Sequence, residues 1–218
     1  MKNELPKGWE IKKLGEVCKI VLGSTPSTEN PKYWDGDIFW ATPKDLGKLE
    51  SIEIYHTERK ITKEGLESCS SQLLPKGTVL LTTRAPIGHV AIAGVEITTN
   101  QGFKNLVCSN NIYNRFLYFL LKCFVLDLQS LGRGATFTEI SKKKVENFEI
   151  PRPPLPEQKR IVAKIEELFE KIDKAKKLRE EAIKETKNLI HSALEEIFSR
   201  AEKERWKRTK LGNIVQTS

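Results

Sequence analysis

A run of 48 residues without proline or glycine, Glu157 to Glu204, constrains this 218-residue chain more than any other feature. Proline and glycine are the residues that most often end helices, so the run predicts one continuous helix. At the usual rise per residue this helix would be about 70 Å long. Pro156 suits the first turn of the helix, and the prolines just before it, in "EIPRPPLPEQ", predict a stiff extended hinge.

Apolar residues recur along this helix with the spacing of a coiled coil. The a and d rows consist of Ile161, Ile165, Leu168, Ile172, Ala175, Arg179, Ala182, Thr186, Leu189 and Ala193. A helix cannot bury such a stripe alone in water, and the chain has no second helix of similar length. The pattern therefore predicts self-association, in which the polar Arg179 and Thr186 fix the register. The alternative is that the helix folds back on its own globular part, which its length disfavours.

The residues up to about 150 have the mixed pattern of an α+β domain. The apolar runs "GTVLLTT", "HVAIAG" and "FKNLVC" predict strands separated by turn residues. A helix is expected from an N-cap at Asn111 to Leu131, buried on nearly all faces and ended by Gly132. A shorter helix is expected to begin at Thr62.

Composition limits the classes of function. The net charge of +8 favours a polyanionic partner such as nucleic acid, although ordinary solubility charge explains it equally well. The four cysteines form no CxxC pair and the histidines are scattered, so no zinc site is expected. The N-terminal residues lack the apolar core of a signal peptide, and the most apolar run is too short to span a bilayer. We therefore expect a cytoplasmic protein with reduced thiols.

Motifs of phosphate-binding loops, dinucleotide turns, nucleophile elbows and zinc hydrolases are absent from the sequence. We therefore expect a non-catalytic chain whose chemistry is recognition. Its candidate DNA contacts lie in three segments, "TTRAPIGHVAI", "TTNQGFKN" and "GRGATFTEISKKK", with Lys44 as a weaker candidate. They are Lys44, Thr82, Thr83, Arg84, Asn100, Gln101, Lys104, Arg133, Thr136, Thr138, Lys142, Lys143 and Lys144.

Each candidate has a structural alternative. An arginine held on a turn presents a fork to guanine or phosphate, but Arg84 equally suits an ion pair with a carboxylate. The Asn100 and Gln101 amides suit adenine edges, whereas asparagine often caps turns. Ser141 is expected to cap a short helix beside Lys142 to Lys144, and that basic run is either a phosphate contact or a solvated surface. Trp34, Phe39 and Trp40 are expected to pack in the core.

The last residues repeat the first. "WKRTKLGNIV" aligns with "WEIKKLGEVC" at an offset of 197, which superposes Trp206 on Trp9 and Leu211 on Leu14. We interpret this tail as the beginning of a second copy that is not completed. It is expected either to pack against a partner chain or to be a frayed terminus.

The chain as a whole resembles the DNA-specificity subunits of type I restriction–modification systems. The resemblance is carried, in the family's order, by "LPKGWEIKKLGEV", "YWDGDIFWATPKDL", "TTRAPIGHVAI", "TNQGFKNL" and "TFTEISKKKVENFEIPRPPLPEQKRIV". It implies a target-recognition domain over 1–153, a spacer and methyltransferase-docking helix over 154–204, and the start of an incomplete repeat over 205–218. The expected form is thus a half-length subunit with one recognition domain.

The resemblance further implies antiparallel pairing of two long helices, here from two chains of a homodimer that reads inverted half-sites on double-stranded DNA. The implied partners are methyltransferase and motor-nuclease subunits, which would bind S-adenosylmethionine, ATP and magnesium in place of this chain. One alternative is a coiled-coil adaptor that binds protein and not DNA. Another is a specificity module with nuclease activity of its own, which the lack of a carboxylate cluster disfavours. The sequence does not reveal which DNA sequence is read.

Overall fold

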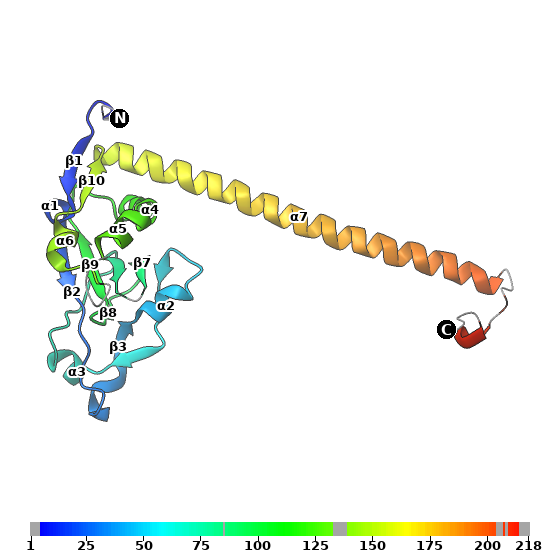
Figure 1. Ribbon diagram of the computed structural model, residues 1–218, viewed down its shortest axis with the longest axis horizontal. Coiled ribbons are helices and arrows are strands. Elements are labelled where there is room, and N and C mark those ends of the chain that lie inside the picture. Colours follow the sequence, from blue (N-terminus) through cyan, green and yellow to red (C-terminus); the bar gives the residue numbers. More distant parts are fainter. Residues whose placement is uncertain (1–4, 85, 133–138, 204–206, 208, 214–218) are drawn as a thin grey trace. The chain divides into compact units, whose positions relative to one another are not determined.

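The computed structural model describes residues 5–84, 86–132, 139–203, 207 and 209–213. The chain divides into a globular unit that extends to Lys164 and a helical unit that begins at Ile165. The predicted α+β class is confirmed, because a mixed globular domain precedes one long helix (Figure 1). The globular unit includes the beginning of the long helix, Leu155 to Lys164.

A five-stranded sheet forms the centre of the globular unit, with the strand order β2-β9-β6-β7-β4. Neighbouring strands run antiparallel except β4 and β7, which are parallel. The three apolar runs singled out in the sequence are β6, β7 and β9. The strands span Cys18–Leu22 (β2), Glu53–Ile54 (β4), Val79–Thr83 (β6), Ile87–Ala93 (β7) and Phe103–Cys108 (β9).

Both faces of this sheet are covered, which explains why its central strands are apolar without alternation. Val79 and Leu81 of β6 point into one core, while Leu80 between them points into the other. All five residues of β6 are buried. The first core is completed by helices α4 (Asn114–Cys123), α5 (Val125–Leu131) and α6 (Lys142–Glu146) and by the beginning of α7 (Leu155–Lys203), and the second by residues such as Ala41 and Ile97.

A smaller three-stranded sheet, of order β5-β3-β8, lies at the end of the globular unit opposite β1 (Glu10–Lys13) and β10 (Glu149–Arg152) (Figure 1). Trp34, Trp40 and Ile61 form its core, and the two indole rings meet edge to face at 5.0 Å. The expected packing role of Trp34 and Trp40 is confirmed, and Phe39 is partly buried. The strands span Trp34–Ala41 (β3), Arg59–Ile61 (β5) and Thr98–Thr99 (β8).

The helix expected from Asn111 to Leu131 is two helices, α4 (Asn114–Cys123) and α5 (Val125–Leu131), so that prediction was wrong in detail. The chain breaks at Phe124, whose ring packs edge to face on Phe148 at 5.7 Å. No proline or glycine marks this position in the sequence. The break is caused instead by the tertiary packing of Phe124. Full burial was also wrong, since Leu126 on α5 is 79% exposed.

Short helices begin at the expected caps. The hydroxyl of Thr62 accepts a hydrogen bond from the Gly65 amide, and α3 follows; the hydroxyl of Ser141 accepts one from the Lys144 amide, and α6 follows. These contacts satisfy amide groups that a helix leaves unpaired at its N-terminus. The short helices span Leu14–Val17 (α1), Pro31–Tyr33 (η1), Pro43–Gly47 (α2), Lys63–Glu67 (α3) and Lys142–Glu146 (α6).

The beginning and the end of the globular unit in the sequence pair with each other, because β1 (Glu10–Lys13) and β10 (Glu149–Arg152) form a two-stranded ribbon. The long helix α7 (Leu155–Lys203) starts directly afterwards. Its Gln158 is fully buried: the side-chain oxygen accepts a hydrogen bond from the Tyr113 amide at 2.7 Å. The side-chain nitrogen donates to the carbonyls of Asn111 and Pro153. Gln158 therefore fixes the first turn of α7 to the globular unit.

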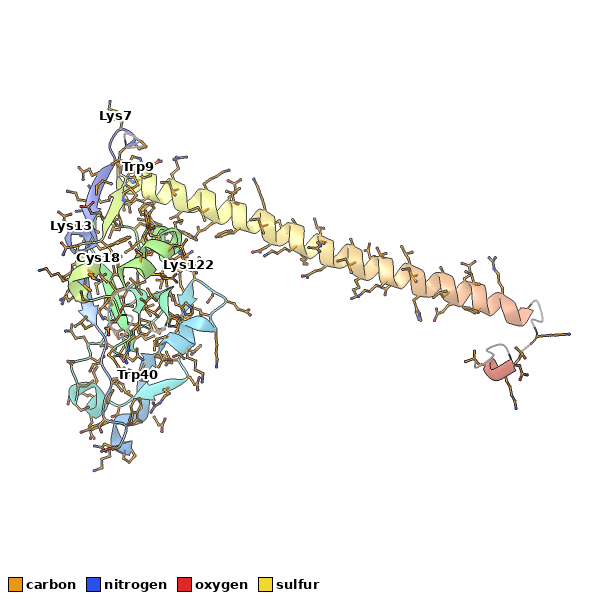
Figure 2. All side chains as sticks on the ribbon, in the orientation of Figure 1. Lys7, Trp9, Lys13, Cys18, Trp40 and Lys122 are labelled. Atoms are coloured by element: carbon orange, nitrogen blue, oxygen red, sulfur yellow. The ribbon has the colours of Figure 1, made fainter. Side chains whose placement is uncertain are left out.

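Within the helical unit, side chains project from α7 along its length and none is buried among those described (Figure 2). Leu168, Phe169 and Ile172 are about half exposed, and Leu189 is 70% exposed. At the start of the helix Ile161, which the heptad pattern placed in the seam, packs against the globular core instead. Among the described helices, none combines the length and apolar character needed to cross a membrane.

The repeated motif forms one helical turn in both places. Leu14 begins α1 and is fully buried, with its amide donating to the Phe148 carbonyl at 2.9 Å. Leu211 begins η2 (Leu211–Asn213) and is 78% exposed. The two copies thus share a local conformation but not an environment.

Candidate nucleic-acid interface

Arg84 follows the end of β6, on a turn closed by buried hydroxyls. The pairing of β6 with β7 shifts its register between Leu81 and Thr83. At this irregularity the Thr82 hydroxyl donates to the Pro86 carbonyl at 2.6 Å and accepts from the His89 amide at 2.9 Å. Thr82 and Thr83 are both fully buried. Their hydroxyls hold the turn and are not on the surface, whereas the Arg84 side chain is 47% exposed.

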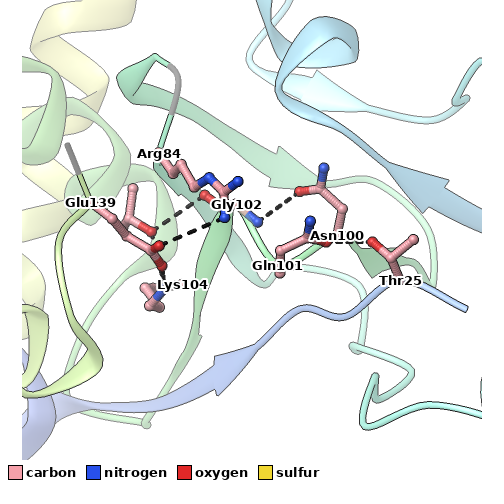
Figure 3. Close-up of polar contacts among 8 residues, drawn as sticks. Thr25, Arg84, Asn100, Gln101, Gly102, Lys104 and Glu139 are labelled. Atoms are coloured by element: carbon pink, nitrogen blue, oxygen red, sulfur yellow. Dashed lines mark hydrogen bonds and ion pairs between the residues drawn. The ribbon is translucent and has the colours of Figure 1, made fainter. Parts of the chain in front are cut away.

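A second turn, Asn100 to Gly102, lies beside the first. The Asn100 side-chain oxygen accepts a hydrogen bond from the Gly102 amide at 2.9 Å, which is the turn-capping role considered for it. The Gly102 carbonyl accepts from the Thr83 amide at 2.8 Å and so joins the two turns. Next to the cap, the exposed Gln101 accepts a hydrogen bond from the Thr25 hydroxyl (Figure 3).

Glycine is required where the chain passes this second turn. A Cβ atom added to Gly23 would lie 1.9 Å from the Asn100 carbonyl oxygen, far inside contact distance. Thr25 follows two residues later and reaches Gln101. The close approach at Gly23 therefore brings the segment after β2 within hydrogen-bonding distance of the turn.

Lys104 and Glu139 form the polar centre of the site (Figure 3). The Lys104 side chain is only 6% exposed; its ammonium donates to Glu139 Oε1 at 2.9 Å and to the Thr83 hydroxyl at 3.2 Å. Glu139 Oε2 lies 3.9 Å from Nη1 of Arg84. Glu139 thus connects a buried and an exposed cation, and the Ile140 amide secures the same segment by donating to the Thr83 carbonyl at 3.0 Å.

The three lysines of α6 have different environments. Lys142 lies 3.6 Å from Glu146, an exposed pair of the kind that contributes little to stability. The Lys144 ammonium donates to the Leu131 carbonyl at 2.6 Å and so caps the end of α5. Lys143 is exposed, and among the described residues its ammonium has no carboxylate partner within 4 Å. Of the three, Lys143 is the cation most available to a phosphate.

Lys44 lies on α2, close to the second turn. The ring of Pro43 would be 3.3 Å from a Cβ atom added at Gly102. The Lys44 ammonium is 2.8 Å from Glu58, and the hydrogen bond to this carboxylate raises the pKa of Lys44. Lys44 therefore remains a cation near the site, although Glu58 partly neutralises its field.

Arg133, Thr136 and Thr138 lie outside the described residues. Apart from Lys44 on α2, the other candidates come from three segments that meet: the end of β6, the residues at and just before the start of β9, and the chain after residue 138. Sequence reasoning missed Glu139, because a lone acidic residue in a basic run carries no pattern. Within the described part of the chain no cluster of histidine, cysteine or acidic residues could hold a metal ion. The arrangement suits the recognition of an anionic surface by a fixed arginine and its neighbours.

The chain thus consists of a mixed α/β globular unit with a polar site around Arg84, followed by a long helix with an exposed apolar stripe. The model of the type I restriction modification DNA specificity domain matches residues 6–185, and the chain belongs to this family. Among curated relatives it is similar to the type I restriction enzyme MjaIX specificity subunit of Methanocaldococcus jannaschii. The identity is 41% over 180 residues, covering 82% of this chain and 42% of the relative.

Two further similarities agree with this family assignment. The EcoR124I/EcoR124II specificity subunit of Escherichia coli is 32% identical over 173 residues, with 75% of this chain and 41% of the relative covered. The crystal structure of the HsdS subunit from Thermoanaerobacter tengcongensis matches with a TM-score of 0.63 at 26% identity, over 79% of this chain and 40% of that chain. The chain spans about two fifths of the length of these relatives.

Proposed function

We propose that this chain is a sequence-specific DNA-recognition subunit of a type I restriction–modification complex, with one recognition domain and no catalytic role. The observation that carries the proposal is the family match over residues 6–185, which includes the whole site around Arg84. The named relatives are all specificity subunits. A cytoplasmic location follows from a role on cellular DNA.

The exposed residues of the site divide by chemistry. Arg84 and Gln101 are on neighbouring turns and offer a guanidinium and an amide, the groups that read base edges. We assign Lys143 and Lys142, which lie on α6, to phosphate contacts, which contribute affinity without sequence information. Thr82, Thr83 and Lys104 hold the turns from inside, because all three are buried. Asn100 caps its own turn.

The helical unit supplies the surface through which we expect two chains to pair. Three residues of its apolar stripe, Leu168, Ile172 and Leu189, are 47–70% exposed in the single chain. Burying them would gain roughly 25 cal/mol for each Å² of apolar surface removed from water. We propose that two chains pair antiparallel through this stripe, which also places methyltransferase subunits against the paired helices. Those subunits and a motor-nuclease subunit would bind S-adenosylmethionine, ATP and magnesium.

A two-fold dimer has a consequence for the DNA target. Two identical recognition domains related by an isologous axis meet the same half-site in inverted orientation. The target is therefore an interrupted palindrome. Mapping the methylated bases in DNA treated with the assembled methyltransferase tests this; an asymmetric bipartite target would rule out the symmetric dimer.

The DNA-recognition proposal is tested by retention of the full chain on duplex DNA, alone and with a methyltransferase subunit, across a salt series. Binding through several phosphates falls steeply as salt rises, because counterions are released from DNA. Salt-insensitive behaviour in both conditions would instead favour a coiled-coil adaptor that binds protein.

A further inference from the structure

We propose that Glu139 acts as a positioning residue that sets the selectivity of DNA recognition, by restraining the Arg84 guanidinium and repelling phosphate from it. This inference rests on the proposed DNA-recognition function and adds a role for a residue to which that function assigns no DNA contact. It concerns the ratio between binding to the target and binding to any duplex.

Lys104, on the interior side of the site, holds Glu139 in place. The Lys104 ammonium is 2.9 Å from Glu139 Oε1, and the lysine side chain is 6% exposed, so the cation has little access to water or to DNA. The Thr83 hydroxyl, 3.2 Å away, occupies a second donor of the same ammonium. The carboxylate is therefore anchored to the interior by one oxygen, and its position does not depend on a ligand.

The other oxygen faces Arg84. Glu139 Oε2 and Arg84 Nη1 are 3.9 Å apart, longer than a strong ion pair, and the side chains are 36% and 47% exposed. Among the described residues Glu139 is the only carboxylate within 4 Å of this guanidinium. The contact is close enough to bias the direction of the fork (Figure 3) and loose enough to leave its remaining donors free.

The backbone ties the two residues together as well. Arg84 and Glu139 form an antiparallel β-bridge, and the Ile140 amide donates to the Thr83 carbonyl at 3.0 Å. The guanidinium and the carboxylate therefore approach from paired positions on two adjacent segments of the same chain. A side-chain pair held in this way is pre-organised, so less conformational entropy is lost when the arginine engages a base.

The electrostatic consequence follows from the sign of the charge. A carboxylate beside Arg84 lowers the attraction between that arginine and the phosphates of any duplex. The carboxylate also lowers affinity for the target, but there the oriented Arg84 guanidinium compensates with paired hydrogen bonds to a base edge. A negative residue in a basic site thus favours discrimination over tight binding.

The test uses the 218-residue chain, a 30-base-pair duplex of random sequence, and rounds of selection from a random duplex library. Glu139→Gln is compared with Glu96→Gln, which removes the same charge from an exposed residue after β7. We expect E139Q to bind the random duplex about 3- to 10-fold more tightly and to lose preference at one base position of each half-site. E96Q should stay within about 2-fold of the parent chain on both measures.

A second comparison separates orientation from charge. In an Arg84→Ala background, E139Q should no longer alter base preference, because the residue it orients is absent. Glu139→Asp retains the charge but shortens the side chain, so it should retain weak random-duplex binding and still flatten the preference. If E139Q fails to fold in a thermal melt, this aspartate variant carries the test of orientation, and unchanged preference would overturn the proposal.

The failure of this inference is distinguishable from failure of the proposed function. If the parent chain shows no salt-dependent DNA binding with or without a methyltransferase subunit, DNA recognition itself is wrong and the role of Glu139 falls with it. If the parent chain selects a sequence and E139Q behaves as E96Q does, only the role of Glu139 is wrong.

Discussion

The Lys104 ammonium lies 2.9 Å from the Glu139 carboxylate, and this pair joins the start of β9 to the segment that leads into α6. The sequence predicts Lys104 as a surface cation that contacts DNA. In the structure it is the only charged residue that is buried in the described part of the chain.

Removing the buried cation should destabilise the domain. Lys104→Met leaves Glu139 without its closest partner, and because that carboxylate is 36% exposed, water offsets part of the loss. We expect the free energy of unfolding to fall by about 1–3 kcal/mol, measured by urea denaturation. Lys19→Met on the exposed side of β2 is the matched control and should change stability by less than about 0.5 kcal/mol. Equal effects of the two variants would contradict a structural role for Lys104.

Gln158 is a second internal anchor, at the first turn of α7. Gln158→Leu leaves the Tyr113 amide and the carbonyls of Asn111 and Pro153 without their present partner. We expect a loss of about 2–4 kcal/mol in unfolding free energy, since unsatisfied buried groups are costly. The control places the same leucine one residue later, at the exposed Lys159, where urea denaturation should detect little change. A stable Q158L variant would show that the helix start is held by its apolar contacts alone.

The exposed stripe of α7 predicts the oligomeric state. Ile172→Asp should convert a dimer of 24.9 kDa chains into monomers in light scattering, because a charge in the seam must be desolvated on pairing. Lys174→Asp, two residues away and outside the a and d rows, should leave the mass unchanged. Ile172 is already 48% exposed in the single chain, so the thermal stability of the globular unit should not change. Dimers that survive I172D would place the interface elsewhere.

The lysines of α6 separate phosphate binding from folding. Lys143→Ala should weaken binding to all duplexes alike and reduce the salt dependence by about one counterion, because one phosphate contact is lost. Lys144→Ala should also lower the melting temperature, since the Lys144 ammonium is bound to the Leu131 carbonyl. Fluorescence anisotropy at several salt concentrations, together with melting curves, distinguishes the two. A change in base preference with K143A would contradict its assignment to phosphate.

The thiol of Cys18 predicts how stability changes at high pH. Its pKa is raised by a hydrogen bond with Cys108 and, secondarily, by burial. The folded state therefore keeps this proton at pH values where the unfolded thiol loses it. Stability is present in full below about pH 8.5 and should decrease above it, by up to about 1.4 kcal/mol per pH unit. Urea denaturation from pH 7 to 10 measures the slope, and Cys18→Ala should reduce it; Cys123→Ala, at an exposed cysteine, should not.

How far the sequence predicts this molecule depends on the range of the interactions involved. The strand β6, the Ser141 cap and the long α7 follow from local patterns, and the structure contains all three. The break at Phe124 could not be predicted, because it arises from packing on Phe148, 24 positions away in the sequence.

The same reason limits what the sequence says about the site. Arg84 lies on an exposed turn, as the segment "TTRAPIG" indicates, and Asn100 has the turn-capping role that was weighed against base contact. The burial of Lys104 and the position of Glu139 depend on a meeting of segments 35 residues apart. No local pattern encodes such a meeting, so the sequence could not distinguish the buried Lys104 from the lysines that lie on the surface.

The turn that carries Arg84 is held by Thr82, Thr83 and backbone groups, all facing inward. Different residues therefore determine the stability of the turn and the chemical group that the turn presents to solvent. Mutation can exchange the side chain at position 84 while the hydrogen bonds that shape the turn stay intact. The chemical group displayed at position 84 can thus be altered without first rebuilding the scaffold that displays it.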